Sequence, residues 1–181
     1  VATGMTSSGG PREYSAAGYH ELVDMPLFVG HFDIDTGRAG GRPIRVASYP
    51  ADGMTAGDRA KLMAQVERML PPQEAVFGVT PFDAFTILQI IDTAYTGISA
   101  LEHRNSFVAI TAREAVGTVA LASIYAHEFF HAWNVKRMRP AALWPYRYDQ
   151  PQITEWLWVS EGVTDYYADL SLVRGEIVDS T

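Results

Sequence analysis

The chain has 181 residues, with 14 Lys and Arg against 21 Asp and Glu, and a formal net charge of -7. This length suits one domain, or two small lobes that share a cleft. It contains no cysteine, which excludes disulfides, thiolate zinc sites and cysteine nucleophiles. An acidic chain lacks the basic stripe that a phosphate backbone requires, so we expect no nucleic-acid partner. Its apolar windows fall short of the roughly 20 residues that span a bilayer, so we expect no membrane partner either.

The N-terminal third is predicted to contain a linker and then strands. Residues 1–18 are rich in Gly, Ser and Ala and begin without Met, which favours a flexible lead-in or linker in a piece of a longer protein. From Leu22 to Pro50, short apolar runs alternate with Gly and Pro, a pattern typical of strands joined by turns.

The next stretch predicts an amphipathic helix. "TAGDRAKLMAQVERML" places apolar residues at helical spacing, with Asp58 in the position of an N-cap. Pro71 and Pro72 follow directly, and we expect them to end the helix.

The second half is predicted to hold two strands and then two long helices. "FDAFTILQIID" reads as a central strand and "SFVAITA" as another, because both are rich in β-branched and aromatic residues. Helices are expected over 118–134 and from about Ile153 to Val173. Strands followed by long helices indicate an α+β fold.

The stretch "YAHEFFHAWN" carries the strongest chemical signal. His127 and His131 lie four positions apart, so on a helix they differ by about 40° around the axis and about 6 Å along it. Two imidazoles on one face can share one ion. Glu128 lies about 100° from His127, where it can reach a water on that ion and act as a general base.

A zinc site that hydrolyses bonds needs a third protein ligand and an open position for water. Glu161 in "WLWVSEGVTDYYADL" is the best candidate, because Asp165 follows one turn later and can accept the outer N–H of a ligand histidine. Glu155 and Asp169 are rivals, but neither has such an acid one turn on. Two alternatives stay open at this point: structural histidines on a buried aromatic helix, and a divalent ion other than zinc.

The long stretches "HEFFHAWNVKRMRPAALWPY" and "WLWVSEGVTDYYADLSLVR" resemble the glycyl aminopeptidase family of zinc metallopeptidases, within the gluzincin group that includes thermolysin. "YHELVDMPLFVG" and "ALEHRNS" are similar to upstream segments of that family. The resemblance runs from about Tyr19 to Arg174. It implies a thermolysin-like catalytic domain over 19–181, in which a mixed β-sheet lobe precedes the zinc-motif helix and a helix with the third ligand.

The resemblance also implies roles for single residues. His127, His131 and Glu161 match the ligands of one zinc ion, and Glu128 matches the general base. Asp165 matches the acid that orients a ligand histidine. Glu102 in "ALEHRNS" matches a glutamate that binds the free amine of the substrate, where a carboxylate opposite an ammonium sets the cleavage register.

The chain departs from the family pattern in two ways. Ser99 and Ala100 stand where the family has two glycines before "LEH", so a close backbone approach to the substrate is lost. Family members are also longer, with a β-rich N-terminal domain, further C-terminal helices and often a PDZ domain, so the resemblance places this chain in the central catalytic part. The donor that stabilises the oxyanion is expected beyond Thr181, because Tyr166 and Tyr167 read as packing residues.

The resulting hypothesis is a zinc aminopeptidase that removes small N-terminal residues, glycine or alanine, from peptides. A thermolysin-type endopeptidase and a non-catalytic metal-binding scaffold remain alternatives. As an isolated fragment the chain is expected to be weakly active or inactive. The basic run from Lys136 to Arg139 is expected to be a solvated helix end. The family resemblance implies a second role for it, bracing of the catalytic loop.

Overall fold

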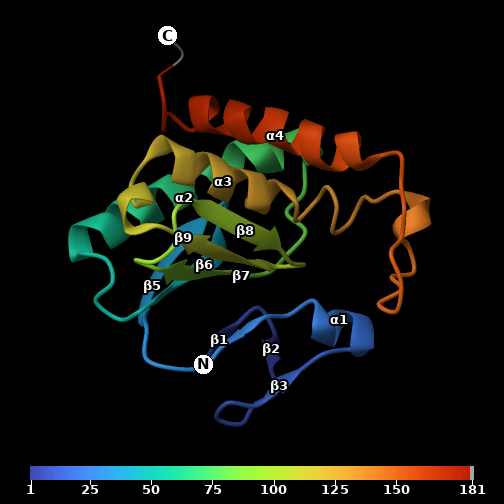
Figure 1. Ribbon diagram of the computed structural model, residues 1–181, viewed down its shortest axis with the longest axis horizontal. Coiled ribbons are helices and arrows are strands. Elements are labelled where there is room, and N and C mark those ends of the chain that lie inside the picture. Colours follow the sequence, from blue (N-terminus) through green and yellow to red (C-terminus); the bar gives the residue numbers. More distant parts are fainter. Residues whose placement is uncertain (180–181) are drawn as a thin grey trace.

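The computed structural model describes residues 1–179 and has a five-stranded mixed sheet with the long helices on one face (Figure 1). The strand order is β5-β6-β7-β9-β8. The strands are β5 Asp33–Ala39, β6 Arg42–Tyr49, β7 Phe85–Ile91, β8 Ile98–Glu102 and β9 Ser106–Thr111. β6, β7 and β9 run parallel, and the edge strands β5 and β8 are antiparallel to their neighbours. The predicted α+β fold is confirmed, with β7 at the centre of the sheet.

Helix α2, Ala56–Phe77, is longer than predicted. Its N-cap is Thr55, whose hydroxyl accepts from the Asp58 amide in a capping box, so the prediction that Asp58 is the N-cap was wrong. The prediction that Pro71 and Pro72 end the helix was also wrong. Tertiary contacts sustain the last turns beyond them, because buried Gln73 donates to the backbone oxygen of Ala126 at 2.7 Å.

Helix α3, Val119–Phe130, turns an aromatic face toward the sheet. Phe129 is fully buried, with its ring centroid 4.5 Å from that of Phe85 and 5.5 Å from that of Phe107. Tyr125 is also fully buried and donates its hydroxyl hydrogen bond to Gln89 in the central strand. This face anchors α3 to the sheet and leaves the face that carries the histidines for other contacts.

The two long C-terminal helices are shorter than predicted. α3 ends at Phe130 rather than near Asn134, because the chain then tightens and the amides of Val135 and Lys136 both donate to the carbonyl of His131. α4 spans Leu157–Arg174 and begins four residues later than expected. Among the described residues, no helix combines the length and apolar character needed to cross a bilayer.

The N-terminal residues form a small layer on the other side of the sheet (Figure 1). β1, Ala2–Thr3, pairs with β4, Leu27–Phe28, and β2, Thr6–Ser7, pairs with β3, Tyr14–Ser15. α1 covers Tyr19–Val23, and short 3-10 helices cover Arg113–Ala115 and Ala141–Leu143. Residues 1–18, expected to be a flexible lead-in, thus include three short strands, of which β1 is buried.

Candidate metal centre

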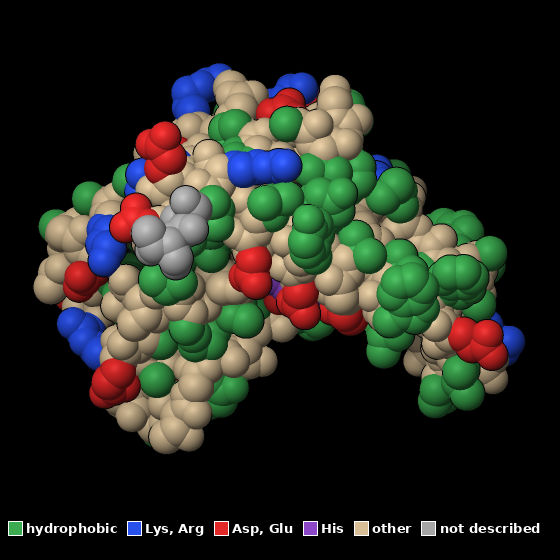
Figure 2. Space-filling view, turned by 90° about the horizontal axis from the view of Figure 1, so that it is seen from above, with side chains coloured by type: hydrophobic (Ala, Val, Ile, Leu, Met, Phe, Trp, Pro, Cys, Tyr) green, Lys and Arg blue, Asp and Glu red, His purple; other side chains and the backbone are tan. Residues whose placement is uncertain are grey.

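His127 lies in the last turn of α3, and His131 caps that helix. Their Nε2 atoms face each other at 2.8 Å. Glu161 of α4 places its Oε2 atom 3.3 Å from Nε2 of His127 and 3.4 Å from Nε2 of His131. Figure 2 shows acidic side chains gathered next to a histidine near the hollowed side of the molecule. The structure therefore brings the three predicted ligands together.

The outer nitrogens of both rings have partners that determine the tautomers. Nδ1 of His131 lies 2.7 Å from the carbonyl oxygen of Asn134, which can only accept, so Nδ1 carries the hydrogen. Nδ1 of His127 lies 2.6 Å from Oδ1 of Asp165, a carboxylate oxygen that accepts in the same way. In the neutral imidazoles both Nε2 atoms then present lone pairs.

Two lone pairs and one carboxylate oxygen converge on the same point, an arrangement that needs a cation to be stable. Two imidazoles and one carboxylate are a donor set that zinc accepts. Zn–N distances of about 2.0–2.1 Å in a tetrahedron put neighbouring ligand atoms about 3.3 Å apart, against the 2.8 to 3.4 Å found here. The residues present therefore fit a zinc ion.

Glu128 is buried beside the histidines, with 6% of its surface exposed. Burial, and then the nearby carboxylates of Glu102 and Glu161, raise the pKa of Glu128 to about 8. Its Oε2 atom is buried and makes no hydrogen bond within the described residues. This carboxyl group can hold a proton and has a free oxygen with which to pass it on.

Glu102 ends the edge strand β8 and reaches the same centre. Ligand atoms of Glu102, Glu128 and His131 lie within 4.8 Å of one another. The Nζ atom of Lys136 lies 3.7 Å from Oε1 of Glu102. The Lys136 side chain is only 11% exposed, so the prediction of a solvated helix end was wrong for this residue. Its burial depends on contacts distant in sequence, which no local pattern indicates.

Comparison with known proteins gives two matches. The family model described as M61 glycyl aminopeptidase matches residues 120–181. The crystal structure of an aminopeptidase N family protein from Idiomarina loihiensis superposes with a TM-score of 0.87 and 30% sequence identity, over 98% of this chain. The two matches support membership of the glycyl aminopeptidase family. It spans 32% of the length of the Idiomarina protein, and no curated protein matches it.

Asn134 is a further residue of the site that the sequence analysis missed. Its side-chain amide donates to the carbonyl oxygens of Val159 and Ser160 and to the hydroxyl of Thr164 at 2.9, 3.3 and 3.1 Å. The backbone carbonyl oxygen of Asn134 accepts the hydrogen bond from Nδ1 of His131. Asn134 thus joins the end of α3 to the first turns of α4, the helix that carries Glu161. The sequence did contain a signal for it, because Asn134 is a polar residue within the otherwise apolar stretch 132–135 that follows His131.

Of the two tyrosines on α4, Tyr167 packs as predicted, whereas the prediction that Tyr166 is a packing residue was wrong. The Tyr167 ring stacks on Phe130 with centroids 5.2 Å apart and an interplanar angle of 7°. Tyr166 is 64% exposed and meets Tyr167 edge to face. Tyr167 therefore belongs to the contact between α3 and α4.

Proposed function

We propose that this protein is a zinc-dependent aminopeptidase with a thermolysin-like catalytic domain over 19–181, acting on peptides with a small N-terminal residue. His127, His131 and Glu161 hold one zinc ion, and Asp165 orients His127. The observation that carries this proposal is the convergence of two Nε2 lone pairs and a carboxylate oxygen, with both Nδ1 atoms already engaged.

When bound, zinc supplies a Lewis acid that polarises a carbonyl and makes water more acidic at neutral pH. Glu128 acts as the general base: it takes a proton from water and gives it to the leaving amine. Burial raises the pKa of this carboxyl group, and the positive charge of a bound zinc ion would offset that effect, so that the carboxylate can take up the proton. Its unpaired Oε2 atom supports the role of general base.

Glu102 binds the free amine of the substrate. Its carboxylate lies near Glu128 and His131, so an ammonium bound to it brings the first peptide bond to the base and sets the register. The family membership and the 32% coverage of the matched structure support a larger protein with β-rich N-terminal and C-terminal helical or PDZ domains.

Metal analysis of the purified protein tests the site. His127→Ala removes one of three ligands and is expected to abolish stoichiometric zinc binding, measured by elemental analysis after dialysis. His31→Ala, at an exposed residue outside the site, is the matched control and should retain one zinc per chain. Retention of zinc by His127→Ala would overturn the site assignment.

Lys136 gives a specific reason to keep the endopeptidase alternative, because its ammonium already lies 3.7 Å from Glu102. Cleavage of a free and an N-acetylated peptide separates the two activities. We expect acetylation to abolish cleavage, since it removes the charge that Glu102 binds. Undiminished cleavage of the acetylated peptide would favour the endopeptidase. Glu128→Gln should abolish both, and unchanged peptidase activity would rule out the base role of Glu128.

A further inference from the structure

A protein cation occupies the neighbourhood of the proposed amine site. The Lys136 side chain is only 11% exposed, and its Nζ atom lies 3.7 Å from Oε1 of Glu102. A substrate ammonium that reached Glu102 would meet a like charge a few ångströms away, which weakens binding in a site shielded from solvent. An aminopeptidase with this geometry needs a means of keeping the lysine off Glu102.

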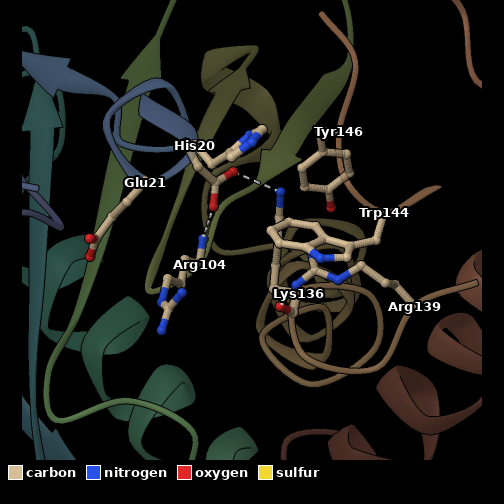
Figure 3. Close-up of a pocket in the computed structure, with 8 residues that line it drawn as sticks. His20, Glu21, Arg104, Lys136, Arg139, Trp144 and Tyr146 are labelled. Carbon is tan, nitrogen blue, oxygen red and sulfur yellow. Dashed lines mark hydrogen bonds and ion pairs between the residues drawn. The ribbon is translucent and has the colours of Figure 1, made fainter. Parts of the chain in front are cut away.

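Asp24, which follows α1, provides a second carboxylate for the same ammonium. Nζ of Lys136 donates to Oδ1 of Asp24 at 2.8 Å, a hydrogen-bonding distance that the 3.7 Å to Glu102 exceeds. In Figure 3 a dashed line marks this interaction at the Lys136 ammonium. Lys136 and Asp24 both line a cavity of about 60 Å³. The lysine is therefore bound to Asp24 and only near Glu102.

Asp24 is itself held in place by the turn that follows Glu102. Its Oδ2 atom accepts from the backbone amide of Arg104 at 2.9 Å, and its Oδ1 atom lies 3.4 Å from Nδ1 of His103. Because His103 and Arg104 directly follow Glu102, these contacts set the separation of the two carboxylates. Of the two carboxylates, the Lys136 ammonium is thereby held next to Asp24.

We infer that Asp24 is a positioning residue, which binds the Lys136 ammonium and so leaves the Glu102 carboxylate open to the ammonium of the substrate. The inference rests on the proposed function, in which Glu102 binds the free amine. Lys136 still offsets part of the negative charge of Glu102 and Glu128, but its hydrogen bond goes to Asp24 and not to Glu102.

Binding to the zinc-loaded protein tests this assignment. Alanine hydroxamate and N-acetylalanine hydroxamate both offer a metal-chelating group, and only the first has a free amine. Calorimetric affinities of the two probes isolate the contribution of the amine. We expect the unmodified protein to prefer alanine hydroxamate by about tenfold or more, as for a close charge pair.

Asp24→Asn should lower the affinity for alanine hydroxamate by about tenfold, because Lys136 then pairs with Glu102. The affinity for the acetylated probe should stay within about twofold. The double variant Asp24→Asn with Lys136→Met should regain the preference, a rescue that a purely structural role of Asp24 would not produce. Asp33→Asn is the matched control, because Asp33 pairs with Arg59 at 3.1 Å and is 25% exposed against 20% for Asp24.

The outcomes separate the two proposals. Equal affinity of the unmodified protein for both probes would overturn the role of Glu102 and this inference with it. A preference that survives Asp24→Asn, or that the double variant does not regain, would overturn the inference alone. If Asp24→Asn does not fold, Lys136→Met alone is the test. This variant should retain the preference for alanine hydroxamate, and loss of that preference would overturn the inference.

Discussion

The two histidines differ in the groups that hold their Nδ1 atoms. His131 is buried and donates to a neutral carbonyl, whereas His127 donates to the carboxylate of Asp165 on the neighbouring helix. A charged acceptor makes the opposite nitrogen more basic than a neutral one does, and it holds the ring orientation. The Asp165 side chain is 71% exposed, so its effect depends on this short hydrogen bond rather than on burial.

Asp165→Ala is therefore expected to weaken zinc binding by about 10- to 100-fold while leaving the fold intact. Competition against a chelator of known affinity measures the change. Asp169→Ala is the control, because Asp169 lies one turn later on the same helix and accepts from Ser123 rather than from a histidine. Equal losses in the two variants would show that the general negative charge of α4, and not the contact with His127, supports the metal.

At the scale of elements, the site depends on how α4 packs against α3. Asn134 makes this connection, since its amide donates to three acceptors in the first turns of α4 and its carbonyl holds His131. The acceptors at 159 and 160 directly precede Glu161. Loss of the Asn134 side chain should loosen the position of Glu161 relative to the two histidines.

Asn134→Ala is expected to lower the free energy of unfolding by about 1–3 kcal/mol, because it leaves buried acceptors without a donor. It should also weaken zinc binding. Thr55→Ala removes the N-cap of α2, far along the chain, and should cost about 1 kcal/mol without changing zinc affinity. Urea denaturation and zinc titration of both variants separate the effects. Unchanged zinc affinity in Asn134→Ala would contradict the connecting role.

The sequence predicted what depends on local spacing and missed what depends on distant contacts. The four-residue interval puts His127 and His131 on one face of any helix, and the interval between Glu161 and Asp165 works in the same way. The burial of Lys136 could not be predicted, since it requires Asp24, 112 positions away. Continuation of α2 through its prolines likewise depends on tertiary contacts, such as that of Gln73 with α3.

At the scale of the whole molecule, Asp24 ties the N-terminal layer to the site. Its partners are the Lys136 ammonium, the His103 ring and the Arg104 amide, all at least 79 positions away in the chain. Apolar contact between this layer and the sheet comes from Ala2, which packs with Ala47 and Leu88, and from the partly buried Phe28 and Phe32 against them. The docking therefore depends in part on this partly buried carboxylate, alongside the hydrogen bonds from Arg45, Thr86 and Asn105 to the backbone oxygens of Thr3 and Gly4.

This dependence predicts how stability changes with pH. Burial alone would raise the pKa of Asp24, but the hydrogen bonds from His103 and Lys136 outweigh it and hold that pKa below its usual value. Asp24 therefore stabilises the fold above the pKa that it has in the unfolded chain, about 3.9, and this contribution is lost as the pH falls through the lower pKa of the folded state.

Asp24→Asn should be less stable than the unmodified protein at pH 7, and the difference should shrink below about pH 4. Urea denaturation across this range measures it, with Asp83→Asn as an exposed control whose difference should stay near zero. A difference that is constant from pH 7 into acid would mean that Asp24 acts through its shape rather than through its charge.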